Sequence, residues 1–240
     1  MSLQERKGSQ VTMFVISGHD ISTLTEQNGR LVLPDEKLRE QFKRSSGGLV
    51  DIVPEDYDAF VIVGLRHGFR LVTRMMLKYS TVEICGKRKG VTLLSSPCMD
   101  ACIDNQIKDT IALKIRALIK TASNKPVMLI PTPCQIETAL NEKDFDLIPL
   151  RESGELGRIY DRFVARTRAV GEQLGFTFLT QDSRTMIAGG GYTLDEYGRG
   201  GIKYGRNDAK ARSAPDDLQH MNADFGRITL ENMLMAAEKL

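Results

Sequence analysis

The sequence has no apolar run that approaches the length needed to cross a bilayer, and its net charge is only +2. A chain with so little excess charge has no electrostatic requirement for a nucleic acid or an anionic membrane as partner. Residues 1–10 are polar and lack the apolar core of a secretory signal peptide. We therefore expect a cytoplasmic protein without a nucleic-acid or membrane partner.

Cysteine and histidine, which are common metal ligands, are scarce. The four cysteines are Cys85, Cys98, Cys102 and Cys134, and the three histidines are His19, His67 and His220. In the cytoplasm we expect the thiols to be reduced. The pair at 98 and 102 can share a helix face, but without a second pair this spacing is a weak zinc signal. We therefore expect no metal and no cofactor.

The composition is that of an ordinary globular protein, with 41% hydrophobic and 27% charged residues in a chain of 240. This length suits one large domain with a sizeable core. We expect residues 1–10 to be a loose arm and residues 11–240 to be a single domain without internal repeats. The basic segment 86–90 is typical of a solvated turn.

Four short apolar runs predict buried strands at 11–16, 59–63, 126–131 and 176–179. Apolar stripes at helical spacing predict helices at 33–44, 69–79, 100–121 and 155–174, and a last helix that ends near Leu240. Strands that alternate with helices of these lengths favour a parallel sheet with right-handed crossovers. The predicted fold is therefore α/β, a three-layer α/β/α sandwich with a central parallel sheet.

Small polar turns follow the first two predicted strands, where open α/β sheets carry their ligand sites. The first turn contains Ser17, Gly18 and His19, and the second contains Gly64, Arg66 and His67. The three histidines would thus lie at one edge of the sheet. If they converge with an aspartate, they form a possible zinc, iron or nickel site, which is one alternative for function.

Residues 181–216 form a long segment that differs from the rest, with seven glycines between Gly189 and Gly205. Such segments in compact domains are often functional, although many are plain surface loops. A substrate-facing loop is the leading functional interpretation. A second alternative is contact with single-stranded nucleic acid, because Tyr192, Tyr197 and Tyr204 alternate with basic residues.

The segment Asp217-Leu218-Gln219-His220-Met221-Asn222 precedes the last predicted helix. The carboxylate of Asp217 can accept the Nδ1 proton of His220, which leaves Nε2 free to act as a base. Asn222 or Asp224 can cap the helix that follows. This Asp-x-x-His block, continued by Met-Asn-x-x-Phe-Gly, resembles the final block of bacterial SGNH (GDSL-like) hydrolases. The agreement in architecture extends from about Val11 to the end, but only this block is specific.

The resemblance implies an SGNH-hydrolase or flavodoxin-like fold and hydrolysis of a carboxylic ester, such as an O-acyl group of a carbohydrate or lipid. It implies a Ser-His-Asp mechanism in which His220 is the general base and Asp217 orients it. The family's Gly-Asp-Ser pattern is absent after the first predicted strand, so Ser17 is the first candidate nucleophile and Ser22 the second.

The resemblance also suggests where an oxyanion or substrate would bind. Gly64 stands at the glycine position of the family's Gly-x-Asn block, and Arg66 replaces the asparagine. The backbone N–H of the first and the guanidinium of the second are candidate oxyanion donors. The remaining candidates for substrate binding are Gly18, His19, His67 and Asn222.

Two other functions stay open beside ester hydrolysis. One is a catalytically inactive descendant that kept the binding pocket and lost the serine. The other is a metal-dependent enzyme that uses His19, His67 and His220. The sequence makes no prediction of oligomeric state.

Overall fold

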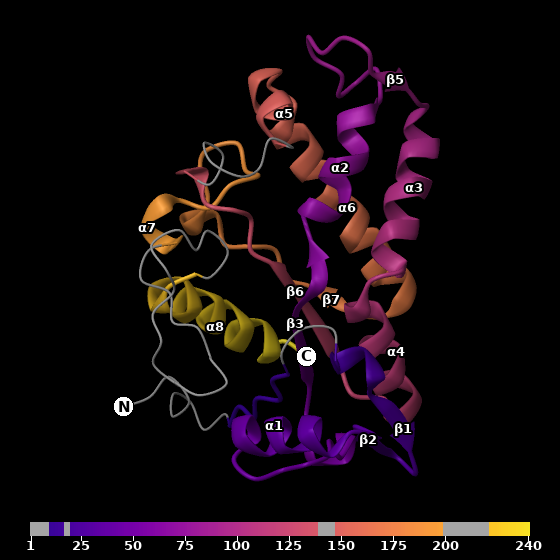
Figure 1. Ribbon diagram of the computed structural model, residues 1–240, viewed down its shortest axis with the longest axis vertical. Coiled ribbons are helices and arrows are strands. Elements are labelled where there is room, and N and C mark those ends of the chain that lie inside the picture. Colours follow the sequence, from indigo (N-terminus) through magenta and orange to yellow (C-terminus); the bar gives the residue numbers. More distant parts are fainter. Residues whose placement is uncertain (1–9, 17–19, 139–146, 199–220) are drawn as a thin grey trace.

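The computed structural model describes residues 10–16, 20–138, 147–198 and 221–240. Its centre is a parallel sheet of three strands, β3 (Phe60–Gly68), β6 (Val127–Thr132) and β7 (Thr177–Phe178), in the order β3-β6-β7. Helices lie on both sides of this sheet (Figure 1). The predicted α/β class, with three layers around a central parallel sheet, is confirmed.

The other elements surround this sheet. The remaining strands form two small pairs, β1 (Thr25–Gln27) with β2 (Arg30–Val32), and β4 (Tyr79–Ser80) with β5 (Thr92–Leu93). The α-helices are α1 (Glu36–Ser46), α2 (Arg70–Lys78), α3 (Ser96–Lys108), α4 (Ile111–Ala122), α5 (Ile148–Glu152), α6 (Leu156–Leu174), α7 (Asp195–Gly198) and α8 (Ala223–Ala237). Short 3₁₀ turns are η2 (Asp20–Thr23), η3 (Pro54–Asp56) and η5 (Ser183–Thr185).

The middle strand β6 explains why the sheet forms. It pairs with β3 on one side and β7 on the other, and residues 127–131 are all buried. A continuous apolar run is what a strand covered on both faces requires. In register, Ile62, Leu129 and Phe178 are aligned and therefore point to one side of the sheet, which we call the α6 side.

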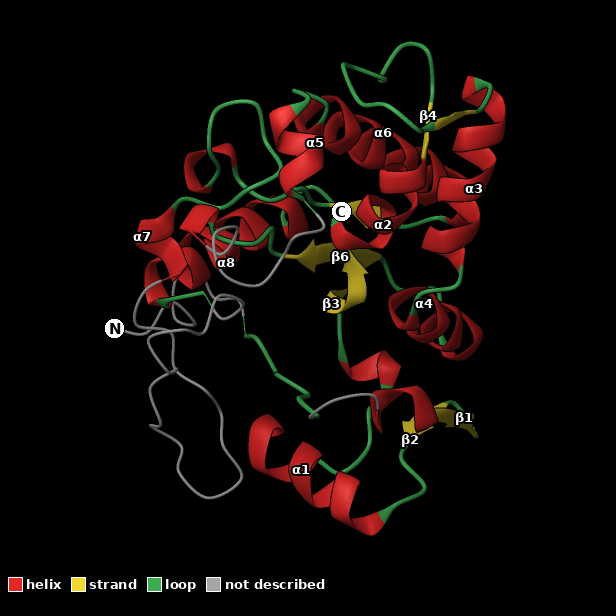
Figure 2. Cartoon of the chain, turned by 45° about the horizontal axis from the view of Figure 1, so that its top comes forward, coloured by secondary structure: helices red, strands yellow, loops and turns green. Residues whose placement is uncertain are grey.

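The opposite side of the sheet, which we call the α8 side, carries Val63 and Ile130, which are paired in register, and Leu179. Figure 2 shows the sheet between α4 on one side and α8 on the other. The α6 side is covered by α4 and α6, which pack on β3 and β7 respectively. The sheet therefore separates the layer of α4 and α6 from the layer of α8.

The helix α6 has a sequence that fixes both its buried face and its end. Leu156, Ile159, Phe163, Thr167 and Val170 recur at helical spacing and are all buried. Gly175 ends the helix in the left-handed conformation, with φ 72°, as its type and position predict. No helix in the described part of the chain has both the length and the apolar character needed to cross a membrane.

Ion pairs join α6 to the neighbouring helix α3. Arg162 Nε donates to Asp100 Oδ1 at 2.8 Å, and Arg166 makes a two-pronged contact with Asp104. The segment 86–90 is also attached to this layer, so the prediction of a solvated turn is wrong for Arg88. Its guanidinium donates to Glu155 Oε1 at 3.0 Å and to Oε2 at 2.6 Å, and the Glu155 side chain is completely buried.

The predicted first strand, at 11–16, is wrong, because these residues have no regular structure. The Phe14 ring instead packs edge-on against Phe42 of α1, with ring centroids 5.1 Å apart. The N–H of Val15 donates to Ser45 Oγ at 2.9 Å rather than to a neighbouring strand. An apolar run shows that a segment is partly buried, but it does not supply the strand edge that a ladder needs.

The predicted helix at 100–121 is two helices, α3 and α4, which meet at Thr110. The Thr110 hydroxyl donates to the Ile107 carbonyl at 2.8 Å and accepts from the Leu113 N–H at 3.4 Å. Threonine is a good N-cap because its side chain satisfies a free N–H of the new helix. The apolar stripe continued across the break, so the stripe alone predicted one helix.

Candidate functional site

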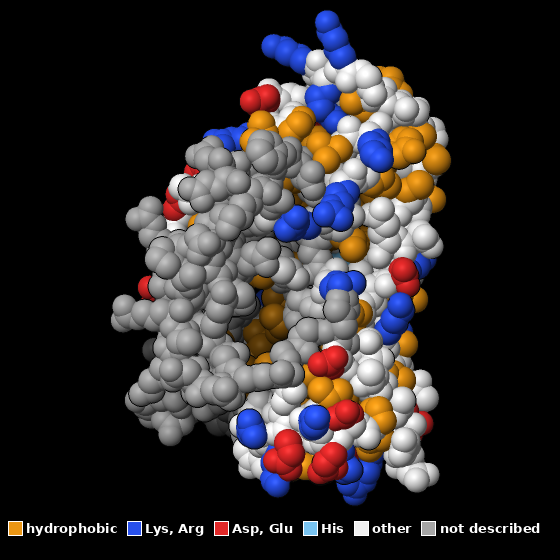
Figure 3. All heavy atoms as spheres, viewed as in Figure 1, with side chains coloured by type: hydrophobic (Ala, Val, Ile, Leu, Met, Phe, Trp, Pro, Cys, Tyr) orange, Lys and Arg blue, Asp and Glu red, His pale blue; other side chains and the backbone are white. Residues whose placement is uncertain are grey.

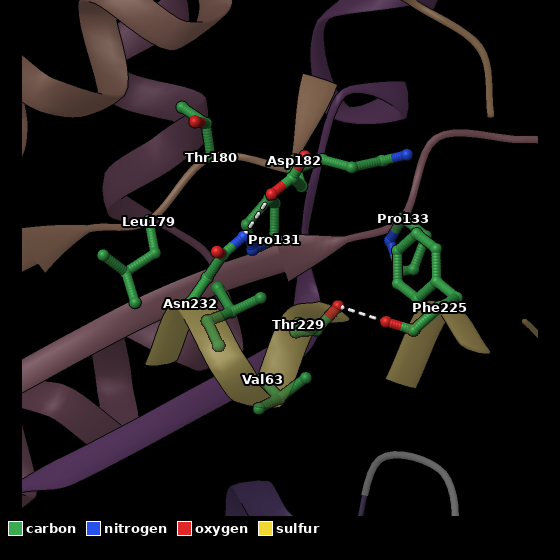
Figure 4. Close-up of a pocket in the computed structure, with 11 residues that line it drawn as sticks. Val63, Pro131, Pro133, Leu179, Thr180, Asp182, Phe225, Thr229 and Asn232 are labelled. Carbon is green, nitrogen blue, oxygen red and sulfur yellow. Dashed lines mark hydrogen bonds between the residues drawn. The ribbon is translucent and has the colours of Figure 1, made fainter. Parts of the chain in front are cut away.

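A small pocket opens at the carboxyl ends of the central strands, on the α8 side of the sheet. It is lined by Val63, Ile130, Pro131, Pro133, Leu179, Thr180, Gln181, Asp182, Phe225, Thr229 and Asn232. Figure 4 shows the sheet residues on one wall and three residues of α8 on the other. Its volume is about 50 Å³. Ligands of open α/β folds bind at this edge, so this pocket is the candidate functional site.

The strand β3 is distorted where it reaches the pocket. Five steps along β3, from Val63 to Gly68, face only two steps along β6, from Ile130 to Thr132. The chain therefore bulges out of the sheet between these residues. The sequence predicted that this strand ends at Val63, but β3 continues to Gly68. Sheet bulges often lie beside functional sites, where they redirect side chains.

The bulge contains three successive residues in the left-handed region. Gly64, Leu65 and Arg66 have φ values of 70°, 47° and 63°. For the two residues with a Cβ atom this conformation costs roughly 1–2 kcal/mol each. A Cβ added to Gly64 would lie 3.2 Å from Thr132 Oγ1, so glycine also permits the close packing of the bulge on β6. Strain of this kind motivates a functional hypothesis for the bulge.

Two of the predicted oxyanion donors belong to this bulge. Gly64 is buried and directly follows Val63, which lines the pocket. Arg66 is exposed, on the surface of the bulge. The structure thus brings the predicted glycine position next to the pocket, while Arg66 is not one of the lining residues.

His67 follows the bulge, but it belongs to the core of the α6 side. Its imidazole is 0% exposed and packs against Phe163 of α6 and Phe178 of β7, with ring centroids 5.6 and 5.7 Å away. Burial lowers the pKa of His67 to about 4, so the ring is neutral at neutral pH. Neither ring nitrogen has a hydrogen-bond partner within the described structure.

This position separates His67 from the pocket, because the sheet lies between them. The structure therefore corrects the expectation that His67 contacts substrate at the strand ends. It also removes one histidine from the hypothesis of a three-histidine metal site. Among the residues that the structure describes, no group of three or more His, Cys, Asp or Glu side chains is arranged to hold a metal. All four cysteines are free.

Asn222 fixes the start of α8, as one of the two predicted caps. Its Oδ1 accepts from the Phe225 N–H at 3.1 Å, and its Nδ2 donates to the Glu196 carbonyl at 2.7 Å. Its own N–H donates to the Tyr197 carbonyl at 2.8 Å. Both ends of the side-chain amide are thus used in the fold. The observed contacts give Asn222 a positioning role, since they place Phe225 at the pocket.

Several other predicted site residues lie outside the described residues. They are Ser17, Gly18, His19, Asp217 and His220. Ser22, the second candidate nucleophile, lies exposed in η2, which packs against α4. It does not line the pocket. Of the predicted residues that fall within the described ranges, the structure therefore brings only Gly64 and Asn222 to the border of the pocket.

The described part of the glycine-rich segment is packed against α6. Tyr192 is fully buried, which corrects the alternative in which its ring stacks on a nucleic-acid base. Gly189, Gly190 and Gly191 all have positive φ, and Cβ atoms at the last two would meet Tyr160 and Leu156 at 2.8 and 2.9 Å. The lack of a side chain at these glycines therefore allows this segment to pack closely against α6. Tyr204 lies outside the described residues.

Asp182 and Asn232 are pocket residues that sequence reasoning missed. The Asn232 amide donates to Asp182 Oδ2 at 2.7 Å, which ties α8 to the segment after β7 (Figure 4). Arg184 donates to both carboxylate oxygens, at 3.0 and 2.8 Å. Together Arg184 and then Asn232 hold the pKa of Asp182 well below its usual range. The sequence did contain a signal for Asp182, because this residue follows the fourth predicted strand, at the edge of the sheet where ligands bind.

No family model, no curated protein and no solved structure matches the chain.

Proposed function

We propose that the protein hydrolyses a carboxylic ester by a Ser-His-Asp mechanism of the SGNH type, on a carbohydrate or lipid O-acyl group. The observation that carries the proposal is the position of α8. Its N-cap, Asn222, lies two residues after His220, and the Phe225 N–H bonded to that cap belongs to a residue that lines the pocket. In sequence, the Asp217–His220 motif thus ends five residues before Phe225, which lines a pocket at the ligand-binding edge of a parallel sheet.

In this proposal His220 Nε2 removes the hydroxyl proton of Ser17 while the serine oxygen attacks the ester carbonyl. The C=O electron pair moves to the carbonyl oxygen, where the Gly64 N–H and the Arg66 guanidinium are the proposed donors. Collapse of this intermediate expels the alcohol, which receives its proton from His220. Water then attacks the acyl-serine with His220 again as base, and releases the carboxylic acid.

Assay of ester hydrolysis with serine variants tests this proposal. We expect Ser17→Ala to lower kcat/KM for an activated ester such as p-nitrophenyl acetate by at least 10³-fold. Ser22→Ala tests the second candidate, and Ser183→Ala, an exposed serine of η5, is the matched control that we expect to leave the rate unchanged. A real esterase activity that survives both Ser17→Ala and Ser22→Ala contradicts the serine mechanism.

A non-catalytic binding protein is the second candidate function. It is favoured by the absence of the family's Gly-Asp-Ser pattern after residue 16. It shares the pocket with the hydrolase and differs only in lacking turnover. Its signature is ligand binding, measured by NMR, in a protein that hydrolyses no ester. The cytoplasmic location and the absence of nucleic-acid and membrane partners stay predictions.

A further inference from the structure

We infer that the pocket on the α8 side holds the acyl chain of the ester and selects short, uncharged acyl groups of about two to four carbons. This inference rests on the proposed function, which it deepens by naming the acyl class. Three features of the described residues carry it. They are the size of the pocket, the chemistry of its lining, and its position between two parts of the proposed site.

The size sets the upper limit on the acyl chain. A cavity of about 150 Å³ holds one benzene molecule, which has six carbons. The pocket, at about 50 Å³, has a third of that room, which corresponds to about two carbons when closed. Val63 on its rim is 58% exposed, so the pocket is open on that side and one or two further carbons reach the surface. Figure 3 shows hydrophobic side chains at the bottom of a hollow over α8 and β3.

The lining favours an apolar occupant. Six of the lining residues are apolar: Val63, Ile130, Pro131, Pro133, Leu179 and Phe225. The polar ones are largely used by the fold. Gln181 Nε2 donates to Thr193 Oγ1 at 2.9 Å and its Oε1 accepts from the Cys134 N–H at 2.8 Å, while Thr229 Oγ1 donates to the Phe225 carbonyl at 2.9 Å. An alkyl group that enters the pocket therefore contacts apolar side chains, and it leaves few polar groups of the lining without a hydrogen-bond partner.

A charged acyl group is disfavoured by the same lining. The charged side chain of the pocket is Asp182, and its carboxylate is already held by Arg184 and Asn232. A second carboxylate, as in a succinyl group, would find no cation among the described lining residues. It would lose hydration without gaining a partner, which is unfavourable. The pocket therefore discriminates against acidic acyl groups.

The position of the pocket connects it to the proposed chemistry. On one side Val63 lines the pocket, and the next residue, Gly64, is the proposed oxyanion donor. On the other side Phe225 lines the pocket and is hydrogen-bonded to Asn222, which follows the proposed base by two residues. An acyl chain in the pocket thus leads toward a carbonyl located between these two segments.

The test compares p-nitrophenyl acetate, butyrate, octanoate and hemisuccinate, with the full chain. We expect kcat/KM for acetate and butyrate to exceed the value for octanoate and hemisuccinate by at least tenfold. Val63→Phe fills the pocket and should lower the acetate and butyrate values at least tenfold. Val82→Phe is the matched control, because Val82 is 75% exposed and lies outside the pocket, and should change nothing. A melting scan checks that both variants fold.

A second variant changes the pocket in the opposite direction. Leu179→Ala enlarges it and should shift the preference toward hexanoate by at least fivefold relative to acetate. Leu93→Ala, in the exposed strand β5, is the control for a leucine truncation elsewhere. Saturation-transfer NMR of methyl butyrate supplies a readout that needs no turnover.

The outcomes separate the inference from the proposed function. Hydrolysis that prefers octanoate, or that is indifferent to Val63→Phe, overturns the acyl pocket and leaves the hydrolase standing. No hydrolysis, with methyl butyrate binding that Val63→Phe abolishes, overturns the hydrolase and retains the short-acyl pocket. Neither hydrolysis nor binding overturns both.

Discussion

The two sides of the central sheet differ in how completely their side chains are packed. On the α6 side, His67, Phe163 and Val170 are at most 1% exposed, and the buried ion pair of Arg88 and Glu155 attaches the segment 86–90 to the start of α6. On the α8 side, Val63 is 58% exposed and a pocket remains between the sheet and the helix. The dense side holds the strands in register, and this allows the other side to keep an unfilled site.

This contrast makes a general statement that can be tested. Substitutions on the α6 side should lower the free energy of unfolding and have little specific effect on chemistry. Substitutions on the α8 side should cost less stability and more activity.

The largest effect is expected from the buried pair of Arg88 and Glu155. Burial by itself raises the pKa of Glu155, but the hydrogen bonds from Arg88 and the Gly86 N–H, together with the charge of the guanidinium, outweigh it, so that the net pKa of this carboxyl is lowered. Arg88→Ala leaves a buried carboxylate without its cationic partner and should lower the free energy of unfolding by about 3–5 kcal/mol. Urea denaturation measures this loss. The control is Lys43→Ala, which breaks an exposed pair with Glu40 and should cost less than about 1 kcal/mol. Equal losses of unfolding free energy in Arg88→Ala and Lys43→Ala would contradict the contrast between the buried layer and the exposed surface.

The second effect is a dependence of stability on pH. Because His67 has a pKa of about 4 in the folded protein and an ordinary value near 6.5 when unfolded, the unfolded chain binds the proton more readily. Stability is complete above pH 6.5 and falls as the pH is lowered toward 4, by about 3 kcal/mol in total. His67→Leu should remove this component, so the difference between wild type and variant across pH isolates it from other titrating groups. A difference that does not change with pH would show that the imidazole is not buried neutral.

The third effect concerns the left-handed glycine in the bulge of β3. Gly64→Ala places a Cβ at φ 70° and should lower the free energy of unfolding by roughly 1–2 kcal/mol. Gly47→Ala, at the end of α1 with φ 79° and nothing within 4 Å of the added atom, carries a similar strain. We expect both to lose stability and only Gly64→Ala to lose ester hydrolysis. Loss of activity in both variants would mean that the bulge has no special role.

The smallest effect on stability is expected from the N-caps. Asn222→Ala removes the cap of α8, and Asp35→Ala removes the cap of α1, each at a cost of about 1 kcal/mol. Because only α8 follows the His220 motif, kcat/KM for ester hydrolysis should fall in Asn222→Ala and stay unchanged in Asp35→Ala. Equal kcat/KM values in the two variants would show that the start of α8 does not position the proposed catalytic site.

The parts of the fold that were predicted correctly are those with a local signal. β6 was predicted because a strand covered on both faces is apolar throughout, and the end of α6 because Gly175 accepts the left-handed conformation. The strand at 11–16 failed because pairing depends on a partner edge that the segment does not encode. The break between α3 and α4 was missed because Thr110 interrupts the backbone without interrupting the apolar stripe.

The site was less predictable than the fold, since it depends on which way side chains point. His67 lies in a polar sequence context, but the bulge directs its side chain into the core, where it packs against aromatic rings. Arg88 belongs to a basic turn, but its partner Glu155 is 67 residues away in sequence. Asp182 and Asn232 meet across 50 residues. Contacts between such distant residues follow from the packing of helices on the sheet and leave no local pattern.

The most direct measurement is labelling with a fluorophosphonate probe, followed by peptide mapping, because it detects an activated serine without knowledge of the substrate. We expect covalent label on Ser17, lost in His220→Ala and retained in Ser183→Ala. Folded protein that takes up no label, or label that His220→Ala leaves unchanged, would contradict the claim that this chain is a serine hydrolase.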